Sequence, residues 1–350
     1  MSLDEFGGWP GILRPLANAT ELTAEQTDAV MTEILHGDAT PAQIAAFIVA
    51  LRMKGETVAE MAGMVRAMLR AATPLDLGVH TATAIDIVGA GGAPIRQKHA
   101  LNVSTMASFV VAGAGARVCK HGNRRASSTS GAFDFLELLG VPVDVSPELV
   151  ARCVDEAGVG FAFARTFHPA MRFAAPVRAE IGIPTVFNVL GPLANPARVR
   201  RYVIGIGDAA MAAKMVRVLA ANGAERAWVV TGDGPIDEIS LTGATQVHTL
   251  DADGTIGHHE LTPDMVGLSC ATVDELAGGD AARNVEIFAA VLAGETGPFR
   301  DFILFNAAAA LVLTEIATDL RDGIVRAAAS IDSGSAQRAL DTVRHIVNAA

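Results

Sequence analysis

Apolar residues recur at helical spacing in the first part of the chain. The clearest set follows Thr40-Pro41 and consists of Ile44, Phe47, Ile48 and Leu51. Steps of three and four residues, with Pro in the first turn and Gly55 after the last apolar position, predict a helix that begins after Thr40 and ends before Gly55. A second helix is predicted from Val58 to Leu69. We therefore expect residues 22–72 to form a small helical unit without a sheet of its own.

From residue 84 the pattern changes to short β-rich apolar runs that alternate with helical stretches. The predicted strands are Ile85–Val88, Ala116–Cys119, Gly160–Phe163, Tyr202–Gly205 and Ala227–Val230. The predicted helices between them cover 105–112, 133–139 and 211–221. This alternation indicates a largely parallel sheet, and ligands of such sheets bind beyond the carboxyl ends of the strands. Residues 280–350 are expected to be helical.

We therefore predict an α/β protein with a small N-terminal helical domain and a larger α/β domain built on a mainly parallel central sheet. The expected boundaries are 1–75 for the helical domain and 76–350 for the α/β domain. The segment 168–195 is punctuated by Pro and Gly, and we expect it to be partly helical and to rejoin the helical domain.

Composition limits the classes of function. Of the 350 residues, 51% are hydrophobic and 19% charged, which is typical of a globular protein. The net charge of -11 argues against general nucleic-acid binding, which needs a basic face. The N-terminus lacks the layout of a signal peptide, and no apolar run is long enough for a membrane span. Three scattered cysteines without metal-ligand spacing suggest free thiols, so we expect a cytoplasmic location and no membrane partner.

The residues with the strongest chemical signal lie between 86 and 140. The turn Gly89-Ala90-Gly91-Gly92 follows the first strand, and Ser104-Thr105 opens the next helix. Lys120-His121-Gly122-Asn123-Arg124 precedes a cluster of hydroxyls at 127–130. Glycine turns and helix starts present N–H groups to anions, so these segments together predict a pocket for a multiply phosphorylated small molecule. Ser104-Thr105 is also expected to cap its helix, a role compatible with phosphate binding.

Two further polar groups are candidates for the site. Asp237-Glu238 follows a Gly-rich turn, and the residues alone leave two interpretations open, a solvated loop or oxygen ligands for Mg²⁺ beside a pyrophosphate. Arg178 lies in a segment rich in Ala, Val and Pro, a setting that favours recognition of a specific carboxylate.

These residues resemble a known family. Over nearly its whole length the chain is similar to the anthranilate phosphoribosyltransferases, and the matching segments are 39–47, 51–57, 120–124, 168–171, 187–196, 237–240 and 297–301. The related pyrimidine nucleoside phosphorylases share the Gly-Asn-Arg and Ser-Ser-x-Ser-Gly patterns. They fit His168-Pro169-Ala170-Met171 and Leu190 to Pro196 less well.

The resemblance implies Mg²⁺-dependent transfer of a phosphoribosyl group from phosphoribosyl pyrophosphate (PRPP) to anthranilate, in tryptophan biosynthesis. It implies an active site between the two domains of a homodimer that pairs through the helical domain. The donor-binding residues would be Gly89, Gly91, Gly92, Asn102, Ser104, Thr105, Lys120, Ser128 and Ser130, with Ser127 in the same cluster. The anthranilate-binding residues would be Asn123, His168, Arg178 and Gly191. The metal ligands would be Ser104, Asp237 and Glu238, and the catalytic residues Lys120, His121 and Asn123.

The chain departs from the family pattern in its Gly-rich loop. The family Thr, Asp and fourth Gly are absent between Gly89 and Asn102, the loop is longer, and Pro94 removes an N–H donor. Ala132 stands where the family has a serine, and Phe133 replaces a small residue. These departures keep two alternatives open: a paralogue with a changed donor or aromatic-amine acceptor, and a non-catalytic binding protein of the same fold.

Overall fold

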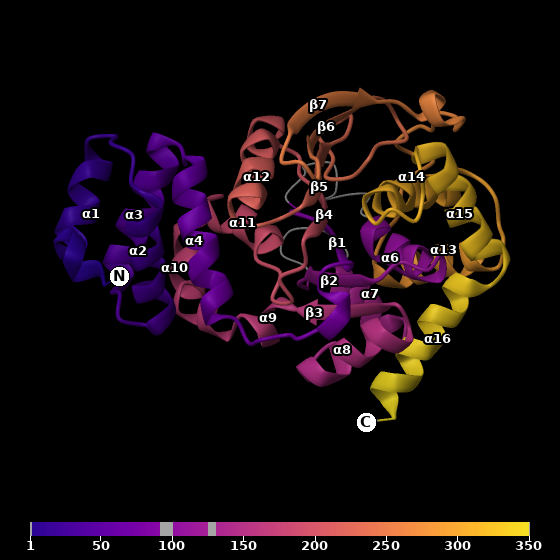
Figure 1. The fold of residues 1–350 in the computed structure, drawn as a ribbon, viewed down its shortest axis with the longest axis horizontal. Helices are drawn as coiled ribbons and strands as arrows, with labels where there is room; N and C mark the ends of the chain where they lie inside the picture. The colour runs from indigo at the N-terminus through magenta and orange to yellow at the C-terminus, as the bar shows by residue number, and fades with distance from the viewer. Residues whose placement is uncertain (1, 92–100, 125–130, 350) are drawn as a thin grey trace.

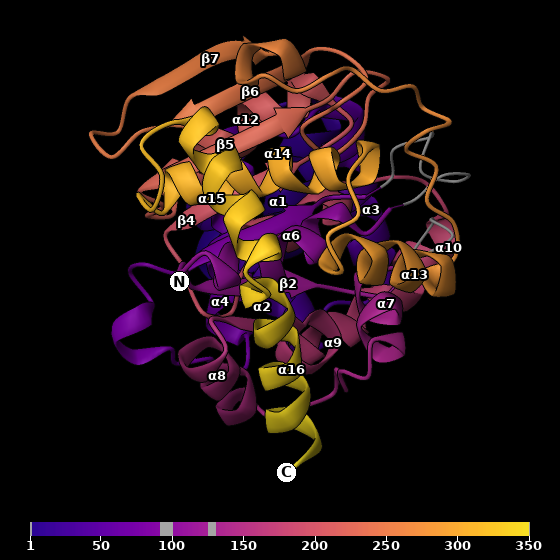
Figure 2. The same cartoon turned by 90° about the vertical axis from the view of Figure 1, so that its right-hand side faces the viewer.

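The computed structural model describes residues 2–91, 101–124 and 131–349. A helical unit lies at one end of the molecule, and the N-terminus belongs to it (Figure 1). The rest of the chain forms a sheet with helices on both faces, as Figure 2 shows from the side. No helix within the described residues is long and apolar enough to cross a membrane.

The helical unit is built from α1 to α4. Its elements are the 3-10 turn η1 (Leu3–Phe6) and the helices α1 (Gly8–Ala17), α2 (Ala24–His36), α3 (Pro41–Lys54) and α4 (Val58–Ala71). The predicted helices after Thr40 and from Val58 are confirmed, and Thr40 caps α3 by accepting a hydrogen bond from the backbone N–H of Gln43. Helix α1 was not predicted, because its Gly and Pro residues are the usual signals of a turn.

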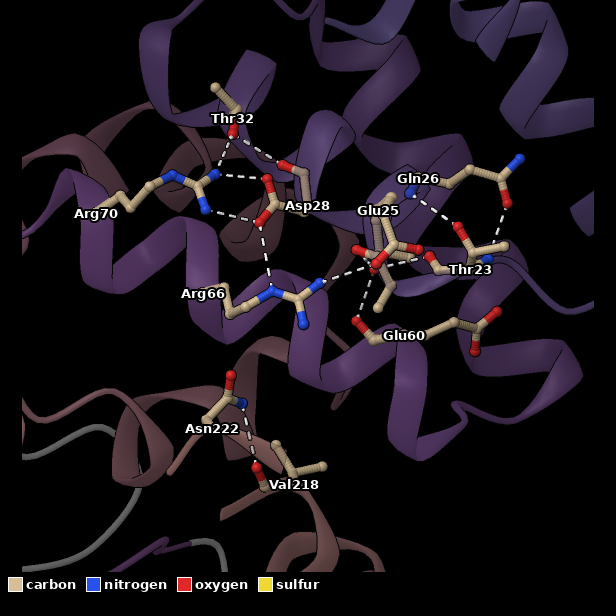
Figure 3. Close-up of polar contacts among 12 residues, drawn as sticks. Thr23, Glu25, Gln26, Asp28, Thr32, Glu60, Arg66, Arg70, Val218 and Asn222 are labelled. Carbon is tan, nitrogen blue, oxygen red and sulfur yellow. Dashed lines mark hydrogen bonds and ion pairs between the residues drawn. The ribbon is translucent and has the colours of Figure 1, made fainter. Parts of the chain in front are cut away.

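Helices α2 and α4 pack closely against each other. A Cβ added to Gly63 of α4 would lie 2.0 Å from the carbonyl oxygen of Ala24, so only glycine fits there. The buried hydroxyl of Thr27 donates to the carbonyl of Glu60 at 2.9 Å. Figure 3 shows the other side of this contact, where the guanidinium of Arg70 donates to the carboxylate of Asp28. Glycine contact and polar bonds together fix the two helices in register.

Over the described residues, the sheet has seven strands in the order β3-β2-β1-β4-β5-β6-β7. The strands are β1 (Ile85–Gly89), β2 (Val118–Gly122), β3 (Val159–Phe163), β4 (Arg201–Gly205), β5 (Arg226–Thr231), β6 (Thr245–Leu250) and β7 (Ile256–Leu261). The first five are parallel, which confirms the predicted α/β fold with a mainly parallel sheet. Strands β6 and β7 are antiparallel and were not predicted, because their polar and His-containing sequences lack apolar runs.

Helices cover both faces of the sheet. The remaining helices are α6 (Val103–Gly113), α7 (Ala132–Leu138), α8 (Pro147–Glu156), α9 (Ala164–Phe167), α10 (Ala175–Ile181), α11 (Phe187–Leu190), α12 (Ala209–Ala221), α13 (Ala281–Leu292), α14 (Pro298–Leu313), α15 (Leu320–Asp332) and α16 (Ser335–Asn348). Short 3-10 turns are η2 (Gly78–His80), η3 (Pro169–Phe173), η4 (Gly191–Leu193) and η5 (Pro263–Val266). Helices α6 and α14 pack on one face, and α12 with the helical unit packs on the other. Helix α10 contacts α3, so part of 168–195 does lie against the helical unit.

The start of α6 differs from the expectation. Its N-cap is Asn102, and Ser104 and Thr105 lie inside the first turn, so the prediction that they cap the helix is wrong. The helix begins at Val103, two residues earlier than the predicted start at Thr105. The side chain of Asn102 accepts a hydrogen bond from Asn284 of α13 at 2.8 Å, which ties this helix start to α13.

Candidate active site

The turn after β1 contacts Asp237 closely. The N–H of Gly91 donates to Oδ2 of Asp237 at 2.9 Å. A Cβ on Gly89 would lie 2.5 Å from the same oxygen, and one on Gly205 of β4 would lie 1.7 Å from the Asp237 carbonyl oxygen. Two adjacent strands thus end in glycines that leave a slot for Asp237, which is 1% exposed. The structure brings Gly89, Gly91 and Asp237 together, and their role in a phosphate and metal site stays a prediction.

Lys120 of β2 lies at the same edge of the sheet. Its ammonium donates to the carbonyl of Ile87 on β1 and, at 3.1 Å, to the hydroxyl of Ser104 on α6. The side chain is almost fully buried. Because a buried positive charge strengthens its interaction with an incoming anion, Lys120 and Ser104 form a suitable corner for a phosphate group.

Two histidines lie beside this corner. The rings of His121 and His168 are 5.0 Å apart, and each donates to a backbone carbonyl, His121 Nδ1 to Gly191 at 3.1 Å and His168 Nε2 to Ala194 at 2.9 Å. Burial and the neighbouring ring lower the pKa of His121 to about 3, and burial also lowers the pKa of His168. Nε2 of neutral His121 is therefore an acceptor, and it is buried without a hydrogen-bond partner among the residues that the structure describes.

Arg178 and Asn123 are the other predicted acceptor residues. The guanidinium of Arg178 lies over the ring of Phe187, 5.4 Å from its centroid, and makes no ion pair with any residue of the described ranges. Burial lowers its pKa. Asn123 is exposed, and its side-chain oxygen accepts from the N–H of Arg124 at 2.8 Å. A half-buried guanidinium without a carboxylate partner is suited to binding a carboxylate ligand.

Asp237 and Glu238 form an adjacent pair of almost completely buried carboxylates. Ile239, the next residue, is held in place by Asn306 of α14. The Asn306 side chain accepts from the N–H of Ile239 and donates to its carbonyl, both at 3.0 Å. Among the described residues, no three acidic, His or Cys side chains form a group that could hold a metal. Two carboxylates suffice for Mg²⁺, which commonly binds to one or two carboxylates and to substrate phosphates. This pair therefore fits a cation that arrives with a phosphorylated substrate.

Other predicted residues are placed less directly. The hydroxyl of Thr105 is buried without a hydrogen-bond partner within the described part of the chain. The predicted positions Gly92, Ser127, Ser128 and Ser130, and the altered segment with Pro94, lie outside the described residues.

Sequence reasoning overlooked Asp86, Asn195 and Asn306. Asp86 and Asn195 are completely buried and hydrogen-bonded to each other next to Lys120 and His121. The available signal was the presence of an acidic residue inside an apolar strand pattern, which requires a buried polar partner.

The chain matches known proteins over nearly all of its length. Residues 81–337 match the glycosyl transferase family a/b domain, and residues 10–72 match the helical bundle domain of the same family. The anthranilate phosphoribosyltransferase of Salinispora arenicola is 49% identical over 339 residues, which is 95% of each chain. The crystal structure of that enzyme from Thermus thermophilus superposes with a TM-score of 0.89 at 39% identity, covering 96% of this chain and 99% of the other.

A more distant structure is informative about ligands. Anthranilate phosphoribosyltransferase from Saccharomyces cerevisiae, in complex with PRPP and Mg, has a TM-score of 0.87 at 28% identity and covers 98% of each chain. Because the α/β and helical-bundle matches together span most of the chain, the similarity concerns the whole fold and not one motif. The chain belongs to the anthranilate phosphoribosyltransferase family.

Proposed function

We propose that this protein transfers the 5-phosphoribosyl group of PRPP to anthranilate, which gives N-(5-phosphoribosyl)anthranilate and pyrophosphate in tryptophan biosynthesis. The observation that carries the proposal is the convergence of three kinds of group at one edge of the sheet. Lys120 with Ser104 forms a cationic corner, and Asp237 with the Gly89–Gly91 turn forms a corner that would take metal and phosphate. Nε2 of His121 is a buried acceptor with no partner within residues 2–91, 101–124 and 131–349.

The donor would bind over the glycine turn, Ser104 and Lys120. In this arrangement Lys120 would lie where negative charge develops on the pyrophosphate as its bond to C1 of the ribose breaks, and the positive charge would need no rearrangement during the reaction. Asp237 and Glu238, with Ser104, would hold Mg²⁺, which supplies charge neutralisation of the leaving pyrophosphate when bound. The other proposed donor-binding residues are Gly92, Asn102, Thr105, Ser128 and Ser130.

The acceptor would bind on the side of the histidines. Arg178 would meet the carboxylate of anthranilate, with His168 and Gly191 beside the ring. The buried Nε2 of His121 would accept a hydrogen bond from the aromatic amine, and Asn123 would help to orient it. An aniline nitrogen is already nucleophilic, so the main task of these residues is to hold it in line with C1.

We further propose a cytoplasmic homodimer that pairs through the helical unit. All three cysteines are free, Cys119 and Cys153 buried and Cys270 exposed, which suits a reducing compartment. Met53 on α3 is 83% exposed, an apolar side chain available for a subunit contact. Light scattering of the purified protein, compared with the variant Met53→Glu, tests the dimer: a mass of one chain for the parent protein would contradict it.

The activity is tested by mixing purified protein with Mg²⁺, PRPP and anthranilate and following the loss of anthranilate fluorescence. We expect a Mg²⁺-dependent decay that Asp237→Ala/Glu238→Ala abolishes. The matched control is Asp274→Ala/Glu275→Ala, which removes another adjacent acidic pair that is exposed in the same domain. Retention of full activity by the first variant, or an equal loss in the control, would contradict the proposed metal ligands.

A further inference from the structure

Strands β1 and β2 separate toward the active site. The described residues 85–89 and 118–122 pair in register only at Ile85 and Val118, whereas β1 pairs with β4 at all five of its residues. Beyond Ile85, hydrogen bonds from side chains to backbone groups connect the two strands in place of backbone pairing. The Lys120 ammonium donates to the carbonyl of Ile87, and the carboxylate of Asp86 accepts from the N–H of His121 at 3.1 Å.

Asn195 completes this set of contacts from the segment after η4. Its Nδ2 donates both to Oδ2 of Asp86 at 2.8 Å and to the carbonyl of Cys119 at 2.9 Å. Its Oδ1 accepts from the N–H of Ala197 at 2.9 Å, which fixes the orientation of the amide. Asp86 and Asn195 thus form a fully buried bracket across the opening between β1 and β2.

Both partners of Asp86 are donors. A carboxylate can accept from the His121 N–H and from Asn195 at the same time, whereas a protonated or amide side chain must present one donor of its own. The bracket therefore depends on the carboxylate form and not only on the shape of the side chain.

We propose that Asp86, held by Asn195, is a positioning residue for the transfer reaction: through the backbone of His121 it sets where the His121 ring and the Lys120 ammonium lie. The proposal rests on the proposed function, because it concerns the same site. It assigns no contact between Asp86 and either substrate. His121 and Lys120 are neighbours on β2, so a shift of this strand end moves the acceptor side and the donor side together.

The charge state of Asp86 gives the proposal a specific signature. Among the described residues, the ionisable side chains that interact with it electrostatically are Lys120 and Cys119 of β2 and Tyr202 of β4, while His121 contacts it through its backbone N–H. Burial raises the pKa of Asp86 to about 7, while Lys120 and the hydrogen bonds from Asn195 and His121 act in the opposite direction. The carboxylate form should therefore be lost when the pH falls through about 7.

The test compares Asp86→Asn, Asn195→Asp and the double variant with Ser330→Ala. Ser330 is a matched control, because its buried hydroxyl donates to the carbonyl of Val110 in α6 away from the site. For Asp86→Asn we expect kcat about 10- to 100-fold below the parent at pH 8. The ratio of the parent kcat to the Asp86→Asn kcat should rise as the pH increases through about 7, because only the parent gains the carboxylate. Taking the ratio removes any effect of substrate titration, since both proteins use the same substrates.

The reciprocal variant tests the pairing itself. Asn195→Asp places a second carboxylate against Asp86, whereas the double variant restores one donor and one acceptor between the two side chains. We expect the double variant to exceed Asn195→Asp in kcat by at least about tenfold, a coupling that independent sites would not show.

Several results would overturn the proposal. One is a kcat of Asp86→Asn within twofold of the parent, and another is a parent-to-variant ratio of kcat that does not change with pH. A third is a loss of kcat that is explained by a lower midpoint of thermal unfolding, to the same extent as in Ser330→Ala. If Asp86→Asn does not fold, the proposal is overturned when the kcat of the double variant does not exceed that of Asn195→Asp. Should the parent protein not consume anthranilate at all, the proposed function fails, and calorimetry of PRPP-Mg²⁺ binding by the same variants still tests the bracket.

Discussion

The slot between Gly89 and Asp237 leads to the most specific prediction, for the variant Gly89→Ala. The added Cβ would lie 2.5 Å from Oδ2 of Asp237, about 0.9 Å closer than the 3.4 Å at which ordinary contact begins. The carboxylate has little room to retreat, because the Asp237 carbonyl oxygen already fills the space over Gly205. Asp237 and the Gly91 N–H bonded to it should therefore shift by close to 1 Å.

A displacement of this size in a catalytic site can cost about 100-fold in rate. We expect kcat/KM of Gly89→Ala to fall about 100-fold, equivalent to about 2.7 kcal/mol, with a higher Mg²⁺ concentration needed for half-maximal rate. The assay is the initial rate of anthranilate fluorescence loss at varied Mg²⁺ and PRPP. The free energy of unfolding, from urea titration, should change by only about 1–3 kcal/mol, the usual cost of a local overpacking.

Gly257→Ala is the matched control for this variant. Its Cβ would lie 2.8 Å from the hydroxyl of Thr249, so it introduces a similar clash in a strand far from the proposed site. We expect its kcat/KM to stay within twofold of the parent. A kcat/KM of Gly89→Ala within threefold of the parent, at an unchanged Mg²⁺ requirement, would refute the view that the slot fixes a catalytic carboxylate.

Three further predictions concern the acceptor side and the fold. Because the folded pKa of His121 is lowered to about 3, the unfolded chain binds the extra proton first, and stability is lost as pH falls from about 6.5 toward 3. Burial raises the folded pKa of Asp86 to about 7, which changes stability in the opposite direction over the same pH range, so the parent is compared with His121→Asn, which keeps Asp86. Between pH 8 and pH 5 the parent should lose about 2 kcal/mol more of its free energy of unfolding, measured by urea titration, than His121→Asn does, and equal changes in the two proteins would contradict the assignment. Arg178→Ala should raise KM for anthranilate about 10- to 100-fold with kcat changed less than threefold, measured by steady-state kinetics; an unchanged KM would exclude the proposed carboxylate contact. Phe47→Ala should lower the free energy of unfolding by about 3–5 kcal/mol, because the ring is fully buried in the helical unit, and a loss below about 1 kcal/mol would show that the unit does not unfold with the rest.

Local patterns explain which elements were predictable. Helices α3 and α4 were found because their apolar spacing and their caps agree, and the parallel strands because each is a short apolar run between helices. Helix α1 and strands β6 and β7 were not predicted. Pro and Gly inside α1 are usual signals of a turn, and the polar residues along β7 lack the apolar run expected of a strand. Tertiary packing overrides local preference in these elements.

The site was predictable in its parts but not in its assembly. The sequence indicated the glycine turn, Lys120 and Asp237 through their residue types and positions after strands. It did not indicate that the His121 ring would lie against that of His168, or that Asp86 would accept a hydrogen bond from Asn195, 109 residues away. Such contacts depend on the order of strands in the sheet, which no local spacing encodes.

The most direct test of the proposed transfer is the stoichiometry of the products. Purified protein is incubated with Mg²⁺, PRPP and anthranilate, pyrophosphate is quantified, and the aromatic product is identified by mass spectrometry. The proposed function predicts one pyrophosphate released for each anthranilate consumed, with a product of the mass of N-(5-phosphoribosyl)anthranilate. Pyrophosphate release without that product, or no reaction from a folded protein, would contradict it.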